Sequence, residues 1–165
     1  MSTIFKTAFW LLAATLGTQV LAQTPVKVES AWARATVQGQ KATGAFMKLT
    51  APQATRLVAV TTPVAGVAEI HEMKMDGGVM KMRAMPVLDL PANQPVELKP
   101  GSYHLMLMDL KAPLMKDSSV ALTLTFKDAK GVETKQQVNL PVSTGMPQGH
   151  GAHQHGEHKA GAHKH

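Results

Sequence analysis

The chain of 165 residues contains no cysteine. Disulfide bonds, cysteine nucleophiles and thiolate metal sites are therefore excluded, although an exported protein could form disulfides. If the protein binds a soft or borderline metal ion, histidine imidazoles and methionine thioethers are the ligands that remain.

Aromatic residues are also scarce, at 4% of the chain. Aliphatic residues and methionine must therefore fill the core. The net charge is +6, but the basic residues are scattered without arginine-rich runs, so we expect no nucleic-acid partner. No Ser/His/Asp set and no catalytic pair of carboxylates stands out, so we do not expect an enzyme.

Residues 1–22 have the pattern of a secretory signal peptide. Lys6 supplies a positive start, an apolar run follows, and Val20-Leu21-Ala22 resembles a small-residue cleavage site. The alternative is a membrane anchor, but the run is short of the roughly 20 residues that a span needs. We therefore expect cleavage, a periplasmic protein and no stable membrane insertion afterwards. No cysteine follows Ala22, so we expect no lipid anchor.

Residues 23–142 show apolar side chains at alternate positions. The alternation is clearest at residues 120–126 and recurs at 45–50, 103–110 and 138–142, while residues 57–61 are apolar and β-branched. Turn signals such as Asp76-Gly77-Gly78, Pro91-Ala92-Asn93 and Lys130-Gly131 separate these segments. Many short strands at regular spacing predict one all-β domain, an antiparallel sandwich or barrel.

Residues 143–165 have a different composition and are predicted to form a disordered, histidine-rich tail. This tail lacks apolar residues for a core. Imidazoles can bind Cu(II), Zn(II) or Ni(II), and Cu(II) stands highest in the affinity order. The candidate Cu(II) ligands of the tail are Met146, His150, His153, His155, His158, His163 and His165.

The two remaining histidines, His71 and His104, lie in a stretch rich in methionine. Seven methionines fall between His71 and Met108, among charged residues, and core filling alone does not account for them. In residues 103–108 a period of two places His104, Met106 and Met108 on one face of a strand.

A hairpin around Asp76-Gly77 would bring further ligands together. If these two residues form the loop, Met73 pairs with Met80, and His71 pairs with Met82. Directly opposed residues have Cβ atoms about 4.5–5.5 Å apart, so an imidazole and a thioether could share one ion. A three-residue turn would shift this register. We expect Met73, Met80 and Met108 to pack beneath the site rather than to serve as alternative ligands.

The spacing of His71, Met82, His104 and Met106 reads H-x10-M-x21-H-x-M. This pattern resembles that of the periplasmic copper chaperones called PCu(A)C, and the resemblance extends from about Val26 to Val142. It implies a cupredoxin-like Greek-key β-sandwich with these four residues as a surface Cu(I) site. It also implies delivery of copper to the cytochrome c oxidase copper centre.

Thioether ligands favour Cu(I) independently of the resemblance, and neutral ligands suit a monovalent ion. Three functions remain open from the sequence. The first is a metallochaperone that hands copper to an acceptor, either a cytochrome c oxidase subunit or another copper chaperone. The second is a copper buffer or resistance protein that delivers to no partner. The third is an enzyme-like role in which Cu(II) captured by the tail reaches the core as Cu(I), but no internal cysteine could supply the electron.

Overall fold

The computed structural model describes residues 24–146, and all regular structure in this range is β-strand. None of these residues forms a helix that could cross a membrane. The strands are β1 (Lys27–Arg34), β2 (Ala42–Thr50), β3 (Thr55–Thr61), β4 (Ala65–Asp76), β5 (Val79–Met85), β6 (Leu88–Leu90), β7 (Pro95–Leu98), β8 (His104–Leu110), β9 (Ser119–Asp128) and β10 (Glu133–Ser143). The predicted signal peptide and the tail from residue 147 onward lie outside the described residues.

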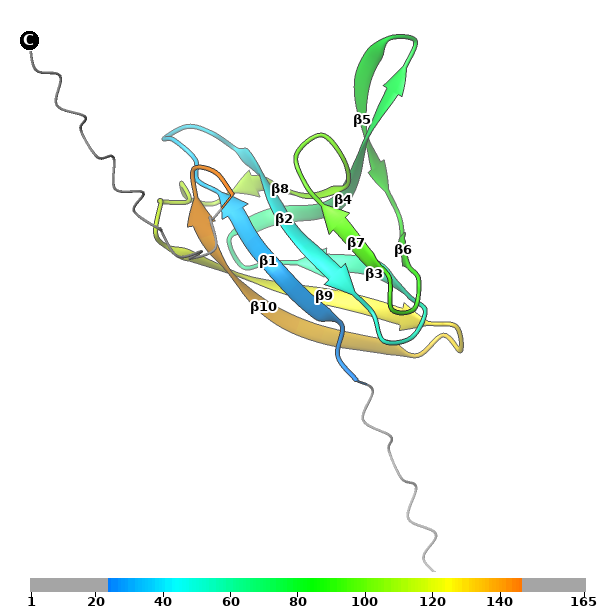
Figure 1. The fold of residues 1–165 in the computed structure, drawn as a ribbon. Helices are drawn as coiled ribbons and strands as arrows, with labels where there is room; N and C mark the ends of the chain where they lie inside the picture. Colours follow the sequence, from blue (N-terminus) through cyan, green and yellow to red (C-terminus); the bar gives the residue numbers. More distant parts are fainter. Residues whose placement is uncertain (1–23, 147–165) are drawn as a thin grey trace, which may run out of the picture.

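The strands follow the order β5-β4-β8-β2-β1-β10-β9-β3-β6, and β7 adds to β2. They fold into two layers that meet where β1 lies beside β10 (Figure 1). This β1–β10 pair is parallel, whereas the other strand pairs in residues 24–146 are antiparallel. The predicted antiparallel β-sandwich is confirmed, and β1 and β10, which are distant in the chain, add one parallel pair to it.

The alternation predicted from the sequence decides which side chains enter the core. On β8, Leu105 and Leu107 are fully buried between the layers, and on β9 Leu122 and Leu124 occupy the same core. Successive side chains of a strand point to opposite faces. His104, Met106 and Met108 therefore lie on the outer face of the β8 layer, as predicted.

A β-bulge in β1 changes which of its side chains reach that outer face. Ser30 has a positive φ of 51°, and the register with β2 shifts between Glu29 and Trp32. Such an extra residue interrupts the alternation of faces. After the bulge Trp32 pairs with Phe46, and their ring centroids are 4.7 Å apart. The two rings form an apolar cluster on the same face as His104.

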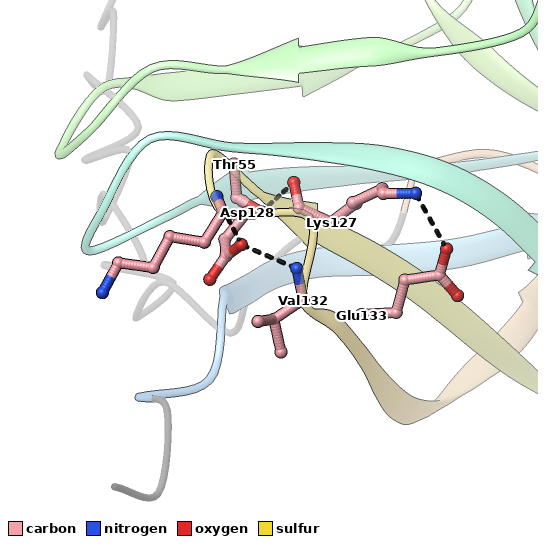
Figure 2. Close-up of polar contacts among 6 residues, drawn as sticks. Thr55, Lys127, Asp128, Val132 and Glu133 are labelled. Carbon is pink, nitrogen blue, oxygen red and sulfur yellow. Dashed lines mark hydrogen bonds and ion pairs between the residues drawn. The ribbon is translucent and has the colours of Figure 1, made fainter.

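The β9–β10 hairpin is closed by side-chain and backbone hydrogen bonds (Figure 2). One carboxylate oxygen of Asp128 accepts from the backbone N–H groups of Lys130, at 2.8 Å, and Val132, at 2.9 Å. The Thr55 hydroxyl donates to the Lys127 carbonyl at 3.0 Å. The predicted turn is thus confirmed, and β3 is tied to the end of β9.

Candidate metal centre

Two histidines lie side by side near the beginning of β8. The antiparallel register of β4 and β8 pairs His71 directly with His104, and their ring centroids are 5.8 Å apart. Both side chains are buried, with 8% and 7% of the residue surface exposed. Neutral imidazoles are common metal ligands, and this pair is close enough to contribute nitrogens to one ion.

Met82 reaches the histidine pair from β5, across the intervening strand β4. Its Sδ lies 3.2 Å from Nε2 of His104. The other ring nitrogen of His104, Nδ1, lies 3.0 Å from the Ser102 carbonyl oxygen. A carbonyl can only accept, so Nδ1 carries the proton and donates it, and Nε2 keeps its lone pair. One imidazole nitrogen and one thioether sulfur therefore converge on the same point.

Met106 is placed at the site by the alternation of β8, two residues after His104. Its register partners are Glu69 on β4 and Gly44 on β2, and its side chain is half-buried. A Cβ atom at Gly44 would lie only 2.7 Å from Cζ of Phe46. The absence of a side chain at Gly44 thus lets the Phe46 ring lie over the strand, 6.4 Å from the His104 ring. The ring thus covers the position on β2 that pairs with Met106.

Glu69 is a site residue that sequence reasoning missed. Its Oε2 lies 2.9 Å from Nε2 of His71, and 43% of its side chain is exposed. A carboxylate that holds one nitrogen of a histidine fixes the ring and raises the basicity of the other nitrogen for a metal. That other nitrogen, Nδ1 of His71, is buried and has no hydrogen-bond partner within residues 24–146. The sequence held a signal for Glu69, because it precedes His71 by two positions and shares its face.

The β4–β5 hairpin has a different register from the predicted one. Met75 pairs with Met80 and Met73 with Met82, and His71 faces Ala84 rather than Met82. The loop is Gly77-Gly78, with φ values of 60° and 81°. The favoured two-residue turn requires a positive φ at both positions, and only glycine adopts it without strain. Because the shift is two residues, the methionines keep the face that the sequence predicted.

The other methionines and histidines considered from the sequence differ in exposure, and some lie outside the described residues. Met80 is 43% exposed, so the expectation that it packs beneath the site is wrong, whereas Met73 and Met108 are half-buried. Met146, which follows β10, is 62% exposed. The six tail histidines lie outside the described residues.

The donor set fits a soft cation better than a hard one. Within residues 24–146 no group of three or more His, Cys, Asp or Glu side chains is placed to hold a metal ion. Two imidazoles and two thioethers, by contrast, are the mixture that suits copper, with the thioethers favouring Cu(I).

Comparison with solved structures defines the class of fold. The chain resembles the copper-bound PCuAC domain from PmoF2, with a TM-score of 0.58 and 21% identity over 76% of this chain and 97% of that domain. It also resembles the solution structure of Cu(I)-DR1885 from Deinococcus radiodurans, with a TM-score of 0.56 and 30% identity over 80% of this chain and 85% of that one. The fold is the cupredoxin-like β-sandwich of PCuAC domains, as the sequence predicted.

The family is defined by the sequence itself. Residues 26–142 match the model of the LpqE-like lipoproteins, and the chain belongs to this LpqE-like family. Protein Lxx21020 of Leifsonia xyli subsp. xyli, which bears a lipoprotein name, is 34% identical over 65% of this chain and 69% of its own length. Protein RP573 of Rickettsia prowazekii is 33% identical over 76% of this chain and 71% of its own length.

Proposed function

We propose that this protein is a periplasmic copper chaperone. It binds Cu(I) through His71, Met82, His104 and Met106, and it delivers the ion to an acceptor such as the cytochrome c oxidase copper centre or another copper chaperone. The observation that carries the proposal is the convergence of His104 Nε2 and Met82 Sδ, 3.2 Å apart, beside His71.

Two comparisons support the proposal. The similar protein DR1885 was solved with Cu(I) bound, and the lipoprotein names in the family accord with an exported protein of the cell envelope. The copper here is cargo rather than a resident cofactor, and the role requires no catalysis.

The chemistry of the ligands suits a carrier. All four are neutral when they bind, so they hold a monovalent ion without a strong charge attraction. Met82 is 49% exposed, so an incoming ligand can approach the copper from the side of this thioether. The buried histidines hold the opposite side of the ion. Copper can therefore be exchanged one bond at a time, which a closed cage of charged ligands would hinder.

We propose in addition that the tail binds copper in its second oxidation state, Cu(II). Its six histidines, together with Met146, capture Cu(II) from the surroundings. The chain thus carries an imidazole-rich segment for the divalent ion in addition to a thioether-containing site for the monovalent one.

The decisive experiment is a transfer assay. The chain loaded with one equivalent of Cu(I) is mixed with a purified, copper-free copper-binding domain of cytochrome c oxidase, and the copper content of each protein is measured after separation. Net transfer supports delivery. Retention of Cu(I) by the chain, at an acceptor affinity that should favour transfer, would leave a copper buffer as the function.

A further inference from the structure

The β4–β5 hairpin carries more methionines than the proposed site uses. On one face of the hairpin, Met73 lies opposite Met82, and Met75 lies opposite Met80. We call these four residues the methionine ladder. The hairpin stands out from the sandwich (Figure 1), and the ladder runs along it from the histidine pair to the Gly77-Gly78 turn.

The outer part of the ladder has no packing role in the described structure. Met75 is 59% exposed and Met80 is 43% exposed. Neither belongs to the core or to the partly buried residues that pack against it. A large apolar side chain exposed singly needs no explanation, but here two stand directly opposite each other and continue a row that ends in a proposed copper ligand.

The other face of the hairpin carries charged side chains that form ion pairs between its two strands. Glu72 forms an ion pair with Arg83, and Asp76 forms one with Lys81, each with a nitrogen–oxygen distance of 2.7 Å. Charged side chains thus occupy one face and thioethers the other, as the alternation of a strand dictates. No carboxylate therefore lies among the four thioethers on their face of the hairpin, which suits a soft, monovalent cation better than a hard, divalent one.

The backbone geometry brings the sulfurs within reach of one ion. The pair that closes a two-residue turn is of the hydrogen-bonded kind, and the two kinds alternate along a hairpin. Met75–Met80 and Met73–Met82 are therefore both pairs of the closer, non-hydrogen-bonded kind, with Cβ atoms about 4.5–5.5 Å apart. Successive pairs are about 7 Å apart along the strand, and three rotatable bonds let each thioether bridge part of that spacing.

We propose that Met75 and Met80, with Met73 as the third ligand, form a second Cu(I) site at the outer end of the hairpin. Copper exchanges between this outer site and the histidine site through Met82, which stands opposite Met73 and contacts His104. The ion moves by replacement of one thioether by the next, with no change in its oxidation state. The inference rests on the proposed function only through Met82, which links the outer site to the histidine site.

The test is a titration of the full chain with Cu(I), added as its acetonitrile complex without oxygen, and followed by NMR of methionines labelled with 13C at the methyl group. The methyl signals of Met82 and Met106 should shift first. Those of Met75 and Met80 should shift with further Cu(I). Met115 is the internal control, because it is 66% exposed in the connection after β8, beyond the end of that strand opposite to His104.

The outcomes separate the two proposals. If Met82 and Met106 respond while Met75 and Met80 stay unshifted to saturation, the outer site is wrong and the inner site stands. If none of these four signals moves, both proposals fail.

A double variant supplies the second test of the outer site. Met75→Leu with Met80→Leu should abolish the late shift of Met73 and leave the early shifts of Met82 and Met106 intact. The matched control is Met115→Leu, which should change neither phase. Persistence of the late Met73 shift in the double variant would overturn the outer site.

Discussion

A double variant in which leucine replaces both Met82 and Met106 should separate the effect on copper binding from the effect on folding. Leucine has nearly the volume and apolar character of methionine but offers no sulfur lone pair to a metal. Met-to-Leu exchanges in packed cores usually cost less than about 1.5 kcal/mol in the free energy of unfolding. Met82 is 49% exposed and Met106 half-buried, so each exchange should cost less than that core value.

The expected loss of copper affinity is larger than the loss of stability. Removal of a residue that merely supports a metal ligand typically costs 10- to 100-fold in affinity. Removal of two direct ligands should therefore weaken Cu(I) binding by at least about 100-fold, which corresponds to about 2.8 kcal/mol. Cu(II), which depends less on thioethers, should be affected less.

The assay is competition for Cu(I) with the chelator bathocuproine disulfonate, beside thermal unfolding of each variant. Two single variants serve as controls. Met47→Leu alters a methionine in the core, 3% exposed, and Met115→Leu alters an exposed one in the connection that follows β8. Both should keep full Cu(I) affinity. A double variant that folds normally and retains wild-type affinity would refute the assignment of Met82 and Met106.

Three further predictions concern the surroundings of the site. Glu69→Gln should weaken Cu(I) binding by about 10- to 100-fold with little change in thermal unfolding, because the carboxylate fixes the His71 ring; an unchanged affinity in the chelator competition would remove Glu69 from the site. Deletion of residues 146–165 should abolish most Cu(II) binding and spare Cu(I) binding, measured by separate titrations, and a loss of Cu(I) binding instead would contradict the two-site arrangement. As the pH falls, protons compete for imidazole nitrogens but not for thioether sulfurs; the tail-deleted chain should therefore lose Cu(I) more gradually than a tail peptide loses Cu(II), and equal steepness would mean that thioethers contribute little.

The features that follow from local alternation were predictable from the sequence. Leu105 and Leu107 on one side of β8, and His104 and Met106 on the other, follow from the period of two alone. The face of each methionine on β4 and β5 was also correct, because an error of two residues in register preserves the face.

The features that depend on backbone strain or strand order were not predictable. Asp76-Gly77 and Gly77-Gly78 both read as two-residue turns, and the choice depends on the cost of a positive φ at a residue with a side chain. The contact between Met82 and His104 depends on β4 lying between β5 and β8, which no local pattern specifies. Likewise, the bulge at Ser30, which turns Trp32 toward the site face, has no signal in composition.

The placement of β5 at the edge of the sheet has a kinetic consequence. Among the described strands β5 pairs only with β4, and every residue of β5 except the last is exposed. Segments with few buried contacts open locally at a lower free energy than the core does. His71 and His104 are buried on the paired strands β4 and β8, whereas Met82 lies on this exposed edge strand. We expect the residence time of copper at the proposed site to follow the opening of this hairpin, so any contact that stiffens the hairpin should hold the ion longer, without a change at either histidine.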